Sequence, residues 1–472
     1  MTSRLNFIFL IADDHRQESV GANGCDEVKT PNLDRLAASG TSFDGAHCQG
    51  GMHPAVCVPS RASLMTGRNI FASSERPDAL DFRGAGNEGL SHRIPAYLPT
   101  FPQRLREAGY ATHGIGKWHN DRESFARSFS SADRIFFGGM SDHDRVPMHD
   151  FDPAGAYDAP PRFETGQSTD LFRQSATDYL DGVDTSMPFC LYVAFTSPHD
   201  PRTPPGAFKV DPDSVSLPAN FLPVHPFDNG EALVRDEMLE AFPRTPEAVR
   251  RHIAEYYGMI SHLDAAIGTI IGAAERRGLA ENTVIIYTAD HGLALGQHGL
   301  MGKQNLYEHS TRVPLVLSGP GIPADIRSPA LVWHADTRAT VLDLAGLEIE
   351  QDSEGASLLP LARGSIGAMR SHFGAAYRMS QRAVLSDRHK LIRYYDRALV
   401  PPTEEQGEGM PTEGTRAVQL FDLETDPTEQ VNLAFHPGSE YIRIRLENFL
   451  LDWQRSVNDP ILEYLKVEVH RP

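Results

Sequence analysis

The chain has 472 residues, with 44 basic and 63 acidic side chains and a formal net charge of −19 at neutral pH. At about 150 residues per domain this length allows two or three domains, and 40% hydrophobic with 23% charged residues exclude a disordered or collagen-like chain. The negative charge disfavours nucleic acid as a partner, because a phosphate backbone would be repelled. For the same reason, a site for any anion would need its own cluster of cations.

The cysteines and the apolar stretches indicate where the protein functions. The four cysteines are too few and too scattered for a disulfide framework, which favours a reducing compartment. The apolar residues 6–12 are short and lead directly into Asp13 and Asp14, so we predict a buried strand rather than a signal peptide. No stretch approaches the ~20 apolar residues that cross a bilayer. We therefore expect a bacterial cytoplasmic enzyme with no membrane partner.

Apolar runs rich in β-branched and aromatic residues alternate with helical patterns along the first 360 residues. This alternation predicts an α/β fold with a large, mostly parallel sheet flanked by helices. Strands are predicted at residues 6–12, 111–115, 189–195, 283–288 and 314–317, and helices at residues 31–40, 98–108 and 249–277. The segments 123–170 and 200–245 are rich in Pro, Asp and Gly, and we expect long loops there.

The pattern changes after residue 360. Shorter alternating runs at residues 383–385, 390–395 and 418–423, followed by an amphipathic stretch at 442–453, predict a small C-terminal antiparallel sheet with one helix. We therefore predict a catalytic domain over residues 1–365 and a C-terminal α+β subdomain over residues 366–472.

Acidic residues follow two of the predicted strands. Asp13 and Asp14 come directly after the first strand, and Asp290 and His291 follow the strand at 283–288. In an open α/β sheet the carboxyl ends of the strands form the ligand-binding edge. Three carboxylates and an imidazole there could bind a divalent cation. Taken separately, each group could equally be a solvated turn, a helix cap or a packing histidine.

The stretch from Cys57 to Arg61 has the sequence CVPSR and is followed by Thr66 and Gly67. It resembles the C-x-P-S-R motif of the type I sulfatases, members of the alkaline phosphatase superfamily, in which the cysteine is oxidised after translation to formylglycine. A structural cysteine before a helix is the alternative. The resemblance implies an alkaline-phosphatase/sulfatase-like fold. It also implies a formylglycine-generating or other maturation enzyme as a partner.

The resemblance continues along the chain and implies further site residues. Lys117 and His119 lie in a G-K-W-H segment, His199 in S-P-H-D-P, and Lys303 in G-L-M-G-K. Each of these would pass for a surface or core residue on its own. Together with Arg61 they supply the cation cluster that an anion site in an acidic protein requires.

The family's chemistry implies a role for each of these positions. A sulfate ester would be hydrolysed by a formylglycine hydrate at position 57, oriented by Arg61. Lys117 and Lys303 would stabilise charge on the sulfate and leaving oxygens, and Lys303 or His199 would donate the leaving-group proton. His119 would act as the base. One metal ion, calcium before manganese or zinc, would be bound by a set of five residues: Asp13, Asp14, Cys57, Asp290 and His291.

His291 keeps alternative functions open. Many sulfatases have asparagine at this position, whereas histidine occurs in some carbohydrate and choline sulfatases and in the related phosphonate monoester hydrolases. A phosphonate monoester or phosphodiester hydrolase is therefore the second hypothesis, and a non-catalytic binding homologue is the third. The segments 70–95, 123–170 and 200–245 are expected to wall the pocket, and their polar content favours a sulfated carbohydrate, as a small molecule or an oligosaccharide. A homo-oligomer is an open alternative to a monomer.

Overall fold

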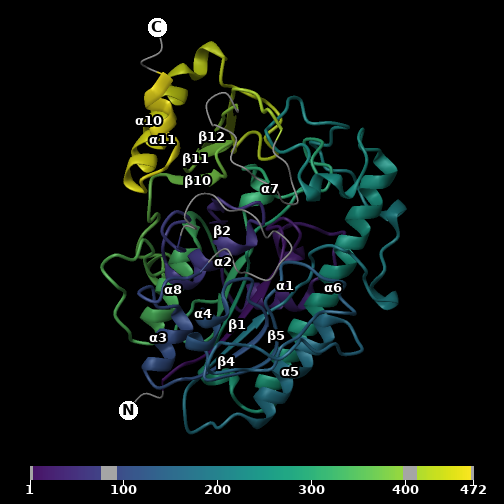
Figure 1. Cartoon of the computed structure of the whole chain (residues 1–472), viewed down its shortest axis with the longest axis vertical. Helices are drawn as coiled ribbons and strands as arrows, with labels where there is room; N and C mark the ends of the chain where they lie inside the picture. Colours follow the sequence, from purple (N-terminus) through teal and green to yellow (C-terminus); the bar gives the residue numbers. More distant parts are fainter. Residues whose placement is uncertain (1–3, 76–92, 397–411, 469–472) are drawn as a thin grey trace.

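One large β-sheet forms the centre of the molecule in the computed structural model, which describes residues 4–75, 93–396 and 412–468 (Figure 1). Its eight strands are, in spatial order, β5 (Ser131–Phe136), β4 (Ala111–Lys117), β6 (Phe189–Ala194), β1 (Asn6–Ala12), β7 (Thr283–Ala289), β8 (Leu315–Ser318), β2 (Gly40–His47) and β9 (Ile326–Trp333). All neighbours are parallel except that β8 runs antiparallel to both β7 and β2. The predicted mostly parallel sheet is confirmed.

The central strands are apolar along their whole length. β1, β6 and β7 have the sequences NFIFLIA, FCLYVA and TVIIYTA, and every residue in them is buried. Strands that are covered on both faces show such continuous runs of β-branched and aromatic residues instead of an alternating pattern. These runs are why the sequence predicted the central strands with nearly correct bounds.

Helices cover both faces of this sheet. One group contains α1 (Pro31–Ala38), α5 (Ser168–Gly182) and α6 (Pro246–Arg276), and the other contains α2 (Cys57–Thr66), α3 (Phe101–Glu107), α4 (Arg122–Ser128) and α8 (His334–Leu344) (Figure 1). The Thr245 side chain accepts the Ala248 N–H at 3.2 Å and caps α6, so this helix begins slightly earlier than predicted. Within the described part of the chain, no helix combines the length and apolar character needed to span a membrane.

A smaller sheet lies beside the C-terminal helices. Its order is β13 (Ala417–Asp422), β12 (His389–Tyr394), β11 (Gln381–Leu385), β10 (Phe373–Tyr377) and β3 (Gly50–Gly51). The first four strands are antiparallel, and α10 (Glu440–Ser456) packs against β10, β11 and β12. The predicted C-terminal sheet and helix are confirmed, and α11 (Ile461–Glu468) follows them. Because β3 comes from residues just before Cys57, this sheet also contacts the segment that leads into α2. The boundary between residues 365 and 366 stays a prediction.

The prediction of long loops over residues 123–170 was wrong at both ends of the segment, whereas residues 137–167 of the described chain form no helix or strand. α4 begins at Arg122, β5 occupies Ser131–Phe136, and α5 begins at Ser168. β5 lies at the edge of the sheet and most of its residues are half-buried, so its sequence lacks the apolar run that marks the central strands. β2 and β9 also went unpredicted, because Gly, Asp and Pro interrupt their sequences.

The segment 200–245 is mostly irregular, as predicted, and contains only short 3₁₀ turns. These are η2 (Gly206–Phe208), η3 (Pro212–Ser214) and η4 (Arg235–Leu239). The remaining short elements are η1 (Gly21–Asn23), η5 (Ala280–Asn282), α7 (Glu308–Thr311), α9 (Leu359–Ala362) and η6 (Pro437–Ser439).

Candidate active site

The two acidic segments meet because their strands are paired. Ala12 at the end of β1 lies opposite Ala289 at the end of β7, so Asp13 and Asp290 leave the sheet side by side. The Asp290 N–H donates to the Ala12 carbonyl at 3.2 Å, and the Asp14 N–H donates to Asp290 Oδ1 at 3.2 Å. Asp14 has a φ of 68°, a left-handed conformation that aspartate tolerates better than most residues. The expected convergence of carboxylates at this edge of the sheet is therefore present.

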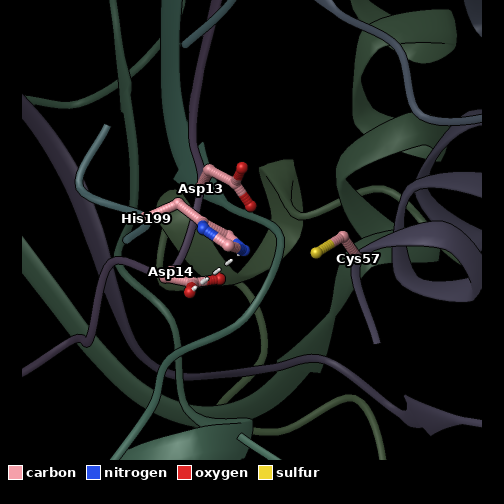
Figure 2. A group of neighbouring side chains, drawn as sticks. All are labelled: Asp13, Asp14, Cys57 and His199. Atoms are coloured by element: carbon pink, nitrogen blue, oxygen red, sulfur yellow. Dashed lines mark ion pairs between the residues drawn. The ribbon is translucent and has the colours of Figure 1, made fainter. Parts of the chain in front are cut away.

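Cys57 is the first residue of α2, and its side chain is buried. Figure 2 shows its sulfur pointing toward Asp13, Asp14 and His199. The sulfur lies 3.2 Å from His291 Nε2, 3.5 Å from Lys303 Nζ and 3.8 Å from Lys117 Nζ. Burial opposes ionisation of the thiol, but Lys117, Lys303 and His291 together hold the pKa of Cys57 well below its usual value. The surroundings of position 57 thus favour negative charge on its side chain.

Arg61 and Lys117 connect this helix to the strand ends. Arg61 lies one turn after Cys57 on α2, where its Nε donates to Asp290 Oδ2 at 2.8 Å and its Nη1 donates to the Lys117 carbonyl at 2.8 Å. Lys117 is the last residue of β4, and its ammonium group donates to Asp13 and, at 2.5 Å, to the Gly139 carbonyl. Both side chains are fully buried. The structure places both predicted cations beside position 57.

Lys303 reaches the site from the loop after β7. Its Nζ donates to Asp14 Oδ1 at 2.9 Å and to Asp14 Oδ2 at 3.1 Å. Three permanent cations in the site face three carboxylates: Arg61, Lys117 and Lys303 against Asp13, Asp14 and Asp290. Their formal charges cancel. A net positive pocket for an anion therefore depends on the histidines and on a bound metal ion.

His119 is a neutral imidazole next to the nucleophile position. It follows β4 with a φ of 56°, and its side chain forms a hydrogen bond with Cys57. Burial and the neighbouring Lys117 lower the pKa of His119 to about 4. Its buried Nδ1 has no hydrogen-bond partner among the described residues. At neutral pH this ring can accept a proton, which agrees with the role of base expected from the sequence.

His199 and His291 have the opposite electrostatic character. His199 Nδ1 lies 2.7 Å from the Asp200 carbonyl oxygen, and its Nε2 lies 3.8 Å from Asp14 Oδ2. Burial favours the neutral ring, but Asp14 outweighs it and the pKa of His199 rises to about 9. Asp290 raises the pKa of His291 to about 9 in the same way. These shifts reflect the negative charge of the adjacent carboxylates, which a bound cation would offset.

The carboxylates and their neighbours form a candidate metal-binding set. The candidate ligand atoms fall into two overlapping groups, each within 4.8 Å: Asp13, Asp14, Cys57 and His199, and Asp13, Cys57, Asp290 and His291. Asp13 Oδ1 is buried without a hydrogen-bond partner among the described residues, and burial raises the pKa of Asp13 to about 8 despite Lys117. An orphaned carboxylate oxygen among mostly hard donors fits one divalent cation. Every predicted ligand belongs to one of the groups, and His199 joins them.

Two of the predicted wall segments border the site. From 123–170, Gly139 accepts from Lys117, and His143 Nε2 lies 3.0 Å from the His199 carbonyl oxygen. From 200–245, Arg235 pairs with Asp200 at 2.6 Å and with Asp236 at 2.7 Å. Residues 76–92 of the third wall lie outside the described residues. Arg235 and Asp236 were not predicted from the sequence, because their segment has no periodicity and matches no motif.

Family models match most of this chain. A model described as Sulfatase matches residues 5–347. A second, described as N-sulphoglucosamine sulphohydrolase, C-terminal, matches residues 296–401. The first match contains every predicted site residue and both strand ends that hold the carboxylates.

Curated relatives are similar over nearly the full length. N-acetylglucosamine-6-O-sulfatase of Bacteroides thetaiotaomicron is 27% identical over 92% of this chain and 83% of that protein. Choline-sulfatase of Rhizobium meliloti is also 27% identical, with the same 92% and 83% coverage. The two relatives act on different sulfate esters, so similarity at this level does not select a leaving group.

Solved structures share the fold at lower identity. A protein in complex with its substrate D-glucosamine-2-N,6-O-disulfate superposes with a TM-score of 0.77 at 23% identity, covering 97% of this chain and 99% of that one. Phosphonate monoester hydrolase of Agrobacterium radiobacter superposes with a TM-score of 0.71 at 21% identity, covering 96% of each chain. At these identities the similarity is one of fold, and it confirms the predicted fold class.

Proposed function

Because the chain belongs to the sulfatase family and is therefore a sulfuric ester hydrolase, we propose that its substrates are sulfated sugars and that position 57 carries the nucleophile. The observation that carries this proposal is the setting of Cys57. Its buried sulfur lies 3.8 Å or less from the Nζ atoms of Lys117 and Lys303, beside carboxylates grouped for a metal ion. Such a site suits an anionic group that is captured and attacked at one atom.

Two groups supply chemistry that the twenty amino acids lack. Oxidised to formylglycine and hydrated, position 57 would supply a hydroxyl group that attacks sulfur as the bond from sulfur to the leaving-group oxygen breaks. Loss of a proton from the second hydroxyl would then expel sulfate and restore the aldehyde. Asp13, Asp14, Asp290 and His291 would hold a divalent cation, which would supply Lewis acidity to the reaction. We propose calcium, because most of the donors are carboxylate oxygens. The imidazole nitrogen leaves manganese and zinc as the alternative metals.

Arg61 and Lys117 orient the reacting groups. Arg61 is fixed by Asp290 and by the Lys117 carbonyl, so its guanidinium holds one position beside residue 57. The Lys117 ammonium lies between Asp13 and position 57, where it binds the non-bridging oxygens of the sulfate group. Neither side chain needs to move for this, since both are already buried and hydrogen-bonded.

Three side chains are assigned to proton transfer, with His119 as the acceptor and Lys303 and His199 as the candidate donors. His119 is neutral at pH 7 because burial lowers its pKa to about 4, so it can take a proton at position 57. Lys303 approaches position 57 from the loop after β7, whereas Lys117 reaches it from the end of β4, and Lys303 is assigned to the leaving-group oxygen. His199, whose Nε2 lies 3.8 Å from Asp14 Oδ2, is the second candidate donor for that oxygen.

The groups that border the site favour a leaving group rich in hydroxyls. Asp200, Arg235 and Asp236 form a charged cluster in which Arg235 bridges the two carboxylates. The Arg235 side chain is 24% exposed, whereas both aspartates are buried. Paired donors and acceptors of this kind bind sugar hydroxyls, while a quaternary ammonium is better bound by aromatic faces.

The substrate proposal is tested by a comparison of sulfate release. Aldehyde-bearing protein is incubated separately with glucosamine 6-sulfate, choline sulfate and 4-nitrophenyl sulfate, and inorganic sulfate is measured, with Cys57→Ala as the control. We expect a higher kcat/KM for the sugar sulfate than for choline sulfate. A preference for choline sulfate would overturn the sugar assignment and leave the sulfatase activity intact.

Two outcomes would favour the other hypotheses. Cleavage of an aryl phosphonate without release of sulfate from any ester would indicate a phosphonate monoester hydrolase. A protein isolated from its own host with cysteine still at position 57 and no turnover would indicate a non-catalytic binding homologue.

A further inference from the structure

The loop that carries Lys303 is held by a buried carboxylate from η4. Glu237 Oε2 accepts the Met301 N–H at 2.9 Å, and its Oε1 accepts the Gly302 N–H at 2.9 Å. Glu237 is buried, with a relative exposure of 2%. Both of its oxygens therefore bind the two backbone amides that directly precede Lys303.

Arg244 anchors this carboxylate. Its Nη2 donates to Glu237 Oε2 at 2.7 Å and to the Glu237 carbonyl at 2.8 Å, and its Nε donates to the Gly299 carbonyl at 3.3 Å. The Arg244 side chain is fully buried. It thus joins the segment after η4 to the start of the Lys303 loop.

The packing around Gly302 leaves the loop little freedom. A Cβ atom at this position would lie 2.4 Å from Gln304 Oε1 and 2.9 Å from the Asp236 Cβ, so no larger residue fits without rearrangement. Gln304 Oε1 accepts the Lys303 N–H at 3.0 Å, while its Nε2 donates to Asp236 Oδ2 at 2.8 Å. The backbone on both sides of Lys303 is therefore tied to residues 236 and 237.

A buried ion pair at this place is not explained by stability alone. Replacing buried ion pairs by apolar residues of similar volume is often neutral or stabilising, because both charges must be desolvated. The Glu237–Arg244 pair instead gives defined directions to two backbone amides next to a long, flexible side chain. Lys303 Nζ lies 3.5 Å from Cys57 Sγ. Because this atom is carried on a flexible stem of four methylene groups, it can adopt many positions relative to its own backbone. A fixed backbone limits the positions that this group can reach.

We propose that Glu237, anchored by Arg244, is a positioning residue that holds Lys303 in its working position beside residue 57. The assignment rests on the proposed function, in which Lys303 serves the leaving-group oxygen. Neither Glu237 nor Arg244 touches the reacting atoms, so each acts only through Lys303.

The first test compares two leaving groups. Glu237→Gln replaces one acceptor oxygen by an amide, which cannot accept from both backbone N–H groups and from Arg244. We expect kcat to fall about ten- to a hundredfold with a sugar sulfate and less than about threefold with 4-nitrophenyl sulfate, since an activated aryl oxide needs little help. Equal losses on both substrates, or no loss, would overturn the positioning role.

A matched control separates positioning from general destabilisation. Asp264 on α6 is also a buried carboxylate that accepts two consecutive backbone N–H groups, from Asn32 at 3.1 Å and Leu33 at 2.8 Å. Asp264→Asn should lower the thermal unfolding temperature without changing the ratio of rates on the two substrates. A changed ratio in this variant would show that any loss of a buried carboxylate produces the effect, and would overturn the assignment.

The second test is a double-mutant cycle with Lys303→Ala. If Glu237 acts through Lys303, then Glu237→Gln should cost less than about twofold once the lysine is absent. The same loss in both backgrounds would overturn the proposal. If Glu237→Gln does not fold, Arg244→Lys takes its place in the cycle, because it keeps the charge and loses the bond to Gly299. Arg244→Lys should lower kcat in the same selective way as Glu237→Gln, but by a smaller factor. An Arg244→Lys variant without this selective loss of kcat would equally overturn the proposal.

Failure of the inference can be distinguished from failure of the proposed function. All variants are compared with the wild-type protein at equal aldehyde content. Wild-type protein that releases no sulfate from any ester contradicts the proposed function itself. Wild-type turnover combined with additive losses in the cycle contradicts only the role of Glu237.

Discussion

The two halves of the active site are held in place by different kinds of structure. Asp13, Asp14 and Asp290 lie at the ends of β1 and β7, and the register of two buried strands sets their positions. Lys303 lies on an irregular loop and depends on Glu237 for its position. The core therefore fixes the metal-binding half directly, whereas a few buried polar contacts fix the half assigned to the leaving group.

This difference predicts how each half responds to mutation. Strand ends remain in place as long as the core folds, so conservative changes around them should alter metal binding more than geometry. A loop held by polar contacts can shift by about 1 Å while the fold stays intact, and a shift of that size is costly for catalysis. The predictions below test this contrast.

The largest effect is expected at position 57, where the two halves meet. Cys57→Ala removes the nucleophile and should reduce turnover by more than about a thousandfold without unfolding the protein. Mass spectrometry of the active wild-type preparation should find the peptide containing residue 57 lighter than the encoded cysteine. Activity that survives in Cys57→Ala would contradict the assignment.

Lys303→Ala should have the next largest effect. Loss of a charged contact that forms mainly in the transition state costs about 2–4 kcal/mol, or roughly thirty- to a thousandfold in rate, with poor leaving groups. Lys117→Ala is the matched control and should slow good and poor leaving groups alike, because Lys117 binds oxygens that remain on sulfur. The measurement is a plot of log rate against leaving-group pKa. Equal slopes for the wild type and Lys303→Ala would transfer the role to His199.

Asp290→Asn tests the strand-end half. The change removes a carboxylate from the candidate metal group. It also weakens the hydrogen bond that Arg61 Nε donates to Asp290 Oδ2, which is 2.8 Å long in the wild-type protein. We expect metal affinity to fall at least about ten- to a hundredfold, measured by metal analysis after dialysis. Asp336→Asn is the control, because Asp336 is a buried carboxylate that pairs with Arg370 and belongs to neither candidate metal group. Unchanged occupancy and rate in Asp290→Asn would show that it is not a ligand.

The smallest effect is expected for Tyr256→Phe. This variant tests whether a hydrogen bond from outside the sheet helps to position the residues at the strand ends. The Tyr256 hydroxyl donates to the Asp14 carbonyl at 2.6 Å and accepts the Arg16 N–H at 2.9 Å. Its loss leaves two buried groups unpaired and should cost about 1–3 kcal/mol in the free energy of unfolding.

Metal affinity should also fall a few-fold in Tyr256→Phe if the hydrogen bond from the Tyr256 hydroxyl to the Asp14 carbonyl helps to position Asp14. Tyr287→Phe is the control, since the Tyr287 hydroxyl contacts His15 instead of Asp14. Stability should fall in both variants and metal affinity only in Tyr256→Phe. Unchanged metal affinity in Tyr256→Phe would mean that the strand register alone positions the ligands.

The sequence predicted the parts of the molecule that local patterns determine. The apolar runs of β1, β6 and β7 marked the central strands, and the acidic residues after two of them marked the ligand-binding edge. The roles of the site residues came from the family motif and remain predictions.

Features determined by tertiary contacts were not predictable from the sequence. Glu237 and Arg244 lie in a segment without periodicity, and their partners are backbone amides and carbonyls some 60 residues away. Any residue type offers the same backbone groups, so no pattern marks such a contact. The half-exposed edge strand β5 was missed for a related reason, because its pairing with β4 is not visible in its composition.

The central claim is that this site cleaves sulfate esters in preference to the phosphonate monoesters handled on the same fold. It is tested most directly by kcat/KM for 4-nitrophenyl sulfate and for 4-nitrophenyl phenylphosphonate, measured on one preparation whose aldehyde content at position 57 is known. We predict the larger kcat/KM for the sulfate and its loss in Cys57→Ala. A larger kcat/KM for the phosphonate, with the aldehyde present, would contradict the account.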